Sequence, residues 1–327
     1  MVRRSVKTGL AVIALALVAS ACSSVNAVNR RHVGAGSGKG GYGYNIAVVT
    51  HGAAGDAFWS IVKNGVDQAG KDMGDKISYQ SSGDPITQAR YINDEVTKKP
   101  DGLVVSMANP AALKSAVEAA VQAGIPTIVI NSGTDQWKEY GAQTYIGSDE
   151  TVAGQAVGTE LKKDGSSNVL CVIHEAGNTS LEQRCAGVKD TLGGKVTNLQ
   201  VDINNLGAAQ STIQAKLQQD PTIDGVVTLN GQVASYAEKG ITAAGSKAKL
   251  ATFDLSADVC KDIIAGKILF AVDQQPYLQG YLAVQMLTLY KSNLNVLGGG
   301  QPVLTGPSLV TKDNAEQVLK LAAGGTR

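Results

Sequence analysis

The stretch PDGLVVSMANPAALKSAVEAAVQAGIPTIVI, residues 100–130, contains one complete strand–helix–strand pattern. A short apolar run, GLVVS, is followed by a polar turn, an alanine-rich segment of helical period and a second apolar run, TIVI. Continuous apolar runs between helices are typical of parallel strands that are covered on both faces. The stretch therefore predicts part of a parallel sheet in an α/β fold.

The same pattern returns in IDGVVTLNGQVASYAEKGITAAGSKAKLATFD, residues 223–254. At 327 residues, the chain is long enough for two domains with separate cores. We therefore predict two similar, doubly wound parallel-sheet lobes. Strands are expected at residues 46–49, 77–80, 102–106, 127–130 and 144–147 of the first lobe, and at residues 168–173, 195–202, 225–229, 250–254 and 268–273 of the second.

Polar side chains follow seven of these strands closely. Ligands of parallel α/β sheets bind beyond the carboxyl ends of the strands, so these side chains predict a polar rim. Asn, Gln and Asp match the mixed donor and acceptor character of sugar and polyol hydroxyls. The residues are His51, Asn109, Asn131, His174 with Glu175, Asn230, Asp254 and Gln274.

Two of the scarce aromatic residues lie side by side at the start of a predicted helix. The chain has only 3 Phe and 2 Trp, and Phe58 and Trp59 follow Asp56, a good N-cap residue. Aromatic faces stack on the C–H faces of sugars. Phe58 also begins the apolar stripe of the helix, so core packing explains it equally well. Trp59 lies just off that stripe, which favours a place in the site.

Residues 1–21 are typical of an export signal, with a basic start and an apolar stretch that ends in small residues. The sequence ASAC, residues 19–22, resembles a bacterial lipobox, so we predict cleavage and lipidation at Cys22. Secretion without a lipid is the alternative, and the sequence does not separate Sec from Tat export. Residues 22–44 are then predicted to be a lipid anchor and a flexible tether.

Three cysteines remain in the exported part of the chain, where the compartment is oxidising. Cys171 and Cys185 lie in one strand–helix unit and would pair, which leaves Cys260 unpaired. Three buried free thiols are the alternative, because spacing does not decide connectivity.

Several classes of protein are excluded by composition. The charges nearly balance, with 29 Lys and Arg against 28 Asp and Glu, and no basic run points to nucleic acid. With three His and no intact zinc or phosphate-loop motif, we expect neither a metal nor a cofactor. No nucleophile–base pair is evident, so we expect a binding protein rather than an enzyme.

The ordered blocks IAVVTHGAAGDAFWSIVKNG, KPDGLVVSMANP, GIPTIVINSG, YIGSDETVAGQAVG, GNTSLEQRCAG, DGVVTLN, LATFD and DQQPYLQGY resemble a known family. They are similar to the type I periplasmic sugar-binding proteins, of the ribose-binding and inositol-binding kind, that feed ABC importers. The resemblance covers about residues 45–320.

The resemblance implies a set of ligand-binding residues. Phe58 and Trp59 match the stacking pair of that family, and Asp56 stands where a polar Asn is usual. Asn131 replaces a sugar-contacting Asp, and Ser132 replaces an Arg that often follows it, which argues against ribose. In the second lobe the matched positions are Arg184, which grips hydroxyls, then Asn230, Asp254 and Gln274, with Asn178 and Glu175 as further contacts.

The resemblance also implies three crossings between the lobes, near Ser148-Asp149, Gln275-Pro276 and Gly306-Pro307. The first lobe would then contain residues 45–148 and 276–306, and the second residues 149–275 and 307–327. The implied function is capture of a small neutral sugar or polyol between the lobes, as a monomer, for an ABC permease. The alternatives are a sensory module for a membrane receptor, a secreted sugar-active enzyme and a repressor core. The sequence leaves the ligand open among pentose, hexose, inositol and alditol.

Overall fold

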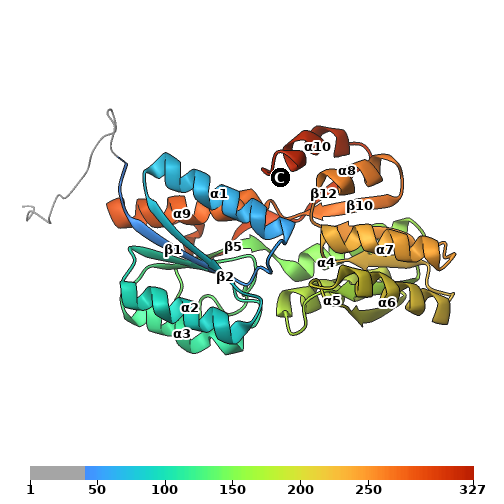
Figure 1. Ribbon diagram of the computed structural model, residues 1–327, viewed down its shortest axis with the longest axis horizontal. Coiled ribbons are helices and arrows are strands. Elements are labelled where there is room, and N and C mark those ends of the chain that lie inside the picture. The colour runs from blue at the N-terminus through green and yellow to red at the C-terminus, as the bar shows by residue number, and fades with distance from the viewer. Residues whose placement is uncertain (1–40) are drawn as a thin grey trace, which may run out of the picture. The chain divides into compact units, whose positions relative to one another are not determined.

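The computed structural model describes residues 41–327, so the predicted signal peptide and the lipidation of Cys22 lie outside the described residues. The described chain forms two six-stranded sheets, and helices cover both faces of each sheet (Figure 1). We call the two sheets with their helices lobe 1 and lobe 2. None of the helices between residues 41 and 327 is both long and apolar enough to cross a membrane.

Lobe 1 has the strand order β11-β5-β4-β3-β1-β2. Its strands are β1 (Asn45–Thr50), β2 (Lys76–Ser81), β3 (Gly102–Val105), β4 (Thr127–Ile130), β5 (Thr144–Ser148) and β11 (Val303–Gly306). Helices α2 (Pro85–Lys98) and α3 (Pro110–Gln122) cover one face. Helices α1 (Ala57–Met73) and α9 (Pro276–Asn293) cover the other, and the 3₁₀ turn η1 (Gly298–Gly300) precedes β11.

Lobe 2 repeats this order as β12-β10-β9-β8-β6-β7. Its strands are β6 (Asn168–Ile173), β7 (Lys195–Gln200), β8 (Gly225–Thr228), β9 (Lys249–Phe253), β10 (Ile268–Asp273) and β12 (Ser308–Thr311). Helices α4 (Glu150–Lys163) and α5 (Thr179–Leu192) cover one face. Helices α6 (Leu206–Gln219), α7 (Gly231–Ala243), α8 (Ala257–Ile264) and α10 (Ala315–Ala323) cover the other.

All ten strands expected from the apolar runs are present, because buried parallel strands need apolar side chains on both faces. The central strands β3 and β8 are buried at every position. Strands β11 and β12 were not expected, since each is only four residues long and Pro307 separates them. The predicted parallel-sheet lobes are confirmed, and one edge strand departs from the parallel pattern, because β12 pairs antiparallel with β10.

The chain passes between the lobes at three places. It enters lobe 2 between β5 and α4, returns to lobe 1 between β10 and α9, and enters lobe 2 again between β11 and β12. Helix α9 packs along α1, so the segment after β10 completes the core of lobe 1 (Figure 1).

Contacts with lobe 1 begin before Asn45, inside the predicted tether. The Tyr42 N–H donates to the Met73 carbonyl at 2.8 Å, and the Tyr44 N–H donates to the Asp75 carboxylate at 2.9 Å. The end of the expected tether is therefore bound to lobe 1 by backbone hydrogen bonds.

The cysteine alternatives are resolved in favour of one bridge. Cys171 of β6 and Cys185 of α5 form a disulfide, and Cys260 is a buried free thiol. The disulfide ties α5 to β6, the strand beside the edge strand β7 of the lobe 2 sheet. Because Arg184 is the neighbour of Cys185, the bridge also fixes the part of the helix that carries this arginine.

Candidate functional site

A small polar cavity of about 30 Å³ lies between the lobes, beyond the carboxyl ends of their strands. It has room for about two water molecules, so the lobes are nearly closed on one another and must move apart to admit a ligand the size of a sugar ring. The structure brings all nine sequence-predicted site residues to this cavity. They are Asp56, Phe58, Trp59 and Asn131 of lobe 1, and Asn178, Arg184, Asn230, Asp254 and Gln274 of lobe 2.

The lobe 1 wall is formed mainly by the first turn of α1. Asp56 caps the helix, because its carboxylate accepts from the Phe58 N–H at 2.9 Å. The rings of Phe58 and Trp59 meet edge to face, with centroids 5.2 Å apart, and the His51 ring lies 4.6 Å from Trp59. Both aromatic side chains are buried and both line the cavity, so the distinction drawn between them from the helical stripe was wrong.

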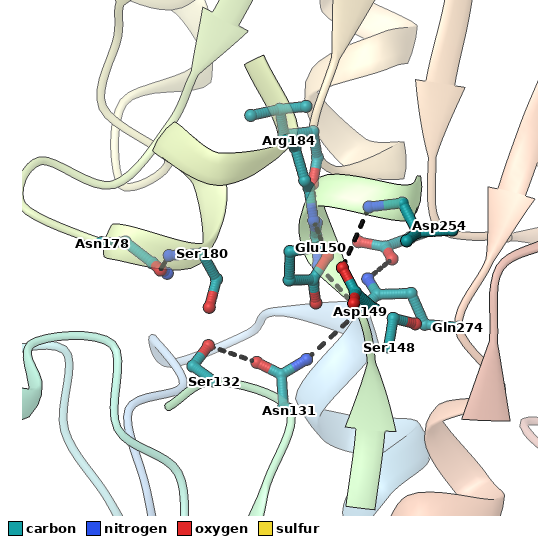
Figure 2. A network of polar contacts seen from close by, with 12 residues as sticks. Asn131, Ser132, Ser148, Asp149, Glu150, Asn178, Ser180, Arg184, Asp254 and Gln274 are labelled. Atoms are coloured by element: carbon teal, nitrogen blue, oxygen red, sulfur yellow. Dashed lines mark hydrogen bonds and ion pairs between the residues drawn. The ribbon is translucent and has the colours of Figure 1, made fainter. Parts of the chain in front are cut away.

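The lobe 2 wall is a connected polar network around Arg184 (Figure 2). The guanidinium donates to both carboxylate oxygens of Glu150, at 2.5 and 3.0 Å, and to the Gln274 amide oxygen at 2.7 Å. The Gln274 amide nitrogen in turn donates to Asp254 at 2.5 Å. The face of Phe253 lies 4.5 Å from the guanidinium carbon, which adds a cation–π contact.

The position of Arg184 depends on a close approach of two helices. Gly154 of α4 lies against the Arg184 backbone, where a Cβ atom would collide with the carbonyl group. Any larger residue at Gly154 would push α5 away from α4 and move the arginine. Burial alone would lower the pKa of Arg184, but the Glu150 carboxylate outweighs burial and raises it. The guanidinium is therefore held in place and charged.

Asn131 and Asp254 occupy equivalent places after β4 and β9, and both have a left-handed backbone, with φ of 63° and 68°. Asn and Asp adopt this conformation more readily than other residues with a Cβ atom. The turn directs each side chain into the network. The Asn131 amide nitrogen lies 3.4 Å from the Gln274 oxygen, which joins the two lobes across the cavity.

Three predicted site residues are also helix N-caps. Each of them therefore both caps a helix and lines the cavity. Asn178 accepts from the Ser180 N–H, and Asn230 accepts from two N–H groups of α7, in the same way as Asp56 caps α1. In Asp56 and Asn230 the second polar atom of the side chain is available to another partner, whereas the Asn178 amide nitrogen donates to Glu175 at 2.7 Å. Capping therefore fixes these side chains at the cavity without using all their hydrogen-bonding groups.

The cavity is rich in buried carboxyl groups. Burial raises the pKa of Asp56 to about 6 and that of Asp254 and Glu175 to about 7. Burial, followed by the nearby charge of Arg184, lowers the pKa of His51 and His174 to about 3, so both rings are neutral at pH 7. Neutral imidazoles and carboxylates both offer acceptors to a ligand.

The sequence analysis did not identify Glu150 as part of the site. An acidic residue in the first turn of a helix is ordinarily explained by the helix dipole, so its type gives no signal. Only the folded chain places it beside Arg184, which is 34 residues away. His51 and His174 were noted as strand-end residues, and both line the cavity, at equivalent places after β1 and β6.

The comparisons with known proteins agree with this geometry. Residues 46–293 match the family model described as periplasmic binding protein domain. The chain is 26% identical to the xylose/arabinose-binding protein XylF of Sulfolobus acidocaldarius, over 74% of this chain and 65% of that protein. It is 25% identical to the ribose import binding protein RbsB of Bacillus subtilis, over 70% of this chain and 75% of that protein.

One solved structure is more similar. It is a carbohydrate transporter of Acidothermus cellulolyticus 11B in complex with myo-inositol, which is 44% identical, with a TM-score of 0.86. The likeness covers 87% of this chain and 100% of that one.

Proposed function

Because this chain belongs to the periplasmic binding protein family, in its type I branch of sugar-binding proteins, we propose that it captures a small neutral sugar or polyol between its lobes. Members of this family bind solutes and are not enzymes. The observation that carries the proposal is the ring of buried hydrogen-bonding side chains that both lobes contribute to one cavity.

A cyclic polyol of the inositol class is the ligand that this chemistry favours. Asp56, Asp254 and Glu175 face the cavity, while Arg184, the only arginine among the residues 41–327 that line it, is already paired with Glu150. The cavity wall therefore offers a ligand more hydrogen-bond acceptors than strong donors. Every oxygen of a cyclic polyol is a hydroxyl that donates, whereas the ring oxygen of a pyranose only accepts. The myo-inositol complex of the 44% identical protein supports the same class.

Ligand capture is coupled to lobe closure through the polar network. Gln274 directly follows β10, where the chain leaves lobe 2 for lobe 1, and its carbonyl accepts from the Thr305 hydroxyl at 2.8 Å beside another crossing. Glu150 follows the first crossing directly. A ligand that bonds to Arg184 and Gln274 is thus bound beside the hinge. Contacts to both lobes stabilise the closed form and shift the population toward it.

The proposal includes an extracytoplasmic lipoprotein that delivers its ligand to an ABC permease. The export signal and lipobox resemblance of residues 1–22 support export and anchoring, and the Cys171–Cys185 disulfide suits an oxidising compartment. The import proteins among the relatives support the permease as partner.

The test is a thermal-shift screen of pentoses, hexoses, inositols and alditols, followed by calorimetry. A ligand at one hundred times its Kd stabilises the folded protein by about 2.7 kcal/mol. We expect myo-inositol to give a clear shift and a 1:1 isotherm. If no sugar or polyol in the panel raises the melting temperature, the proposed function is wrong.

A matched pair of variants tests the place of binding. Asn230→Ala and Asn205→Ala each remove an Asn N-cap from a lobe 2 helix and cost about 1 kcal/mol of stability. Only Asn230 lines the cavity. We expect Asn230→Ala to weaken binding about tenfold and Asn205→Ala to leave it unchanged. Equal affinities of the two variants would place the ligand elsewhere.

A further inference from the structure

A second and much larger space adjoins the small cavity. It is an open groove of about 940 Å³ between the loops that follow β1, β2 and β3 of lobe 1 and the loops that follow β6 and β7 of lobe 2, with the start of α6 as its side. Four side chains line both spaces and form the wall between them: His51, His174, Glu175 and Asn178.

Within residues 41–327, the four shared side chains make no hydrogen bond across the lobes, although beside them the Thr179 N–H of lobe 2 donates to the Ala108 carbonyl of lobe 1 at 3.0 Å. The His51 Nε2 and Glu175 Oε2 atoms are 3.8 Å apart, beyond hydrogen-bond distance. Glu175 is half-buried, unlike the other three, and a hydrogen bond of 2.7 Å from Asn178 within lobe 2 holds it. His174 is 6% exposed, and among the described residues its Nδ1 atom has no hydrogen-bond partner. This wall therefore contains one unused polar atom, the Nδ1 of His174, and one half-buried side chain, Glu175, that has no hydrogen bond to lobe 1.

The opposite side of the small cavity, formed by Arg184, Gln274 and Asn131, is not shared with the groove. Hydrogen bonds connect these three side chains. A group attached to a ligand in the small cavity therefore has room in the groove where it points toward His174 and Glu175. The groove is thus the continuation of the binding site in one direction.

The charge of the groove selects the kind of group. Asp84, Glu175 and Asp202 line it, and no lysine or arginine is among the described residues that do so. A phosphate ester would meet only like charges there, at the cost of its hydration. A glycosyl group carries no charge, and its hydroxyls suit the carboxylates and the amides of Asn109 and Asn204.

We propose that the groove is a second carbohydrate subsite, so that the protein also binds polyols that carry a neutral glycosyl group pointing past His174 and Glu175. The same subsite rejects phosphorylated polyols. This inference rests on the proposed function, because the unsubstituted ring occupies the small cavity.

Calorimetry on the full-length protein with Cys22→Ser tests the inference. The probes are myo-inositol, galactosyl-myo-inositols substituted at different ring carbons, and myo-inositol monophosphates substituted at the same carbons. We expect at least one galactosyl derivative to have a Kd within tenfold of that of myo-inositol. The monophosphate substituted at the same carbon should bind at least 100-fold more weakly than myo-inositol.

Two variants on α6 provide the matched control. Ala208 lines the groove and is exposed, whereas Ala215 is exposed on the same helix outside it. Ala208→Trp should weaken the galactosyl derivative at least tenfold and leave myo-inositol unchanged, and Ala215→Trp should change neither. If myo-inositol binds and no galactosyl derivative does, or if Ala208→Trp has no effect, the subsite is refuted while the proposed function stands. If neither myo-inositol nor any derivative binds, both are refuted.

Discussion

The two lobes have the same scaffold but contribute different chemistry to the cavity. His51 and His174 follow the equivalent strands β1 and β6, and Asp56 and Asn178 cap the equivalent helices α1 and α5. Two and three residues after each cap, lobe 1 has Phe58 and Trp59, where lobe 2 has Ser180 and Leu181, and all four line the cavity. Six residues after the cap, lobe 1 has the core residue Val62 and lobe 2 has Arg184.

This difference separates two tasks. The aromatic pair of lobe 1 gives apolar contact area, which suits any sugar-like ring and discriminates little between ligands. The network of lobe 2 is charged, buried and connected, so an unmatched hydroxyl leaves an expensive unpaired group. We infer that lobe 1 supplies general affinity and lobe 2 supplies specificity. Four experiments test this division.

The largest effect is expected for Arg184→Met. It removes the centre of the lobe 2 network and leaves Glu150 buried without its partner, which costs about 3–5 kcal/mol of stability. Binding should weaken at least 100-fold in calorimetry, with stability measured by urea unfolding. The double variant Glu150→Gln/Arg184→Met should recover most of the stability but none of the affinity. A double variant that binds like the wild type would show that Arg184 acts only on the fold.

The next effect concerns the equivalent pair Asp254 and Asn131. Asp254→Asn keeps the shape and the left-handed turn but removes the charged acceptor, and we expect about a tenfold or greater loss of affinity. Asn131→Ala, on the lobe 1 side, should lower the affinity by about threefold to fivefold. Calorimetry with several polyols measures both. A larger loss for Asn131→Ala than for Asp254→Asn would reverse the proposed division between the lobes.

Affinity should also depend on pH, because three of the side chains that line the cavity are carboxyl groups with raised pKa values. The pKa values of about 6 for Asp56 and about 7 for Asp254 and Glu175 mean that these groups take up protons as the pH falls through neutral. The two histidines, with pKa values of about 3, stay neutral over this range. A ligand hydroxyl donates to the ionised form, so binding releases protons and strengthens as the pH rises.

We expect binding to be about tenfold weaker, and Kd about tenfold higher, at pH 5.5 than at pH 8. Calorimetry in buffers of different ionisation enthalpy detects the released protons. A flat pH profile without proton release would mean that these carboxyl groups do not accept hydrogen bonds from the ligand.

The last of the four experiments is Trp59→Leu, which gives lobe 1 the residue that lobe 2 has at Leu181. Loss of an aromatic face costs about 0.5–1.5 kcal/mol beyond the buried area, so affinity should fall roughly fivefold. The ranking of different polyols should remain the same. A changed ranking in a polyol panel would show that the lobe 1 wall takes part in discrimination.

The sequence by itself determined the order of the strands and helices, the two lobes and most of the cavity wall. Apolar runs must be covered by helices, polar residues at strand ends must meet at one edge, and caps must precede helices. These are local requirements, so Asp56, Asn230 and Gln274 were recognisable before the fold was known. The family resemblance added Asn178 and Arg184, for which local pattern gives little signal.

Only the tertiary structure decided which distant groups become partners. The Glu150–Arg184 pair, the Cys171–Cys185 bridge and the groove beside the cavity join segments that no spacing rule connects. Strands β11 and β12 belong here too, because four residues carry no clear pattern without the sheets that they extend. The physical reason is that the three crossings set two independently folded sheets face to face. Side chains far apart in the sequence then share one buried volume, where an unpaired charge or donor is too costly to leave alone.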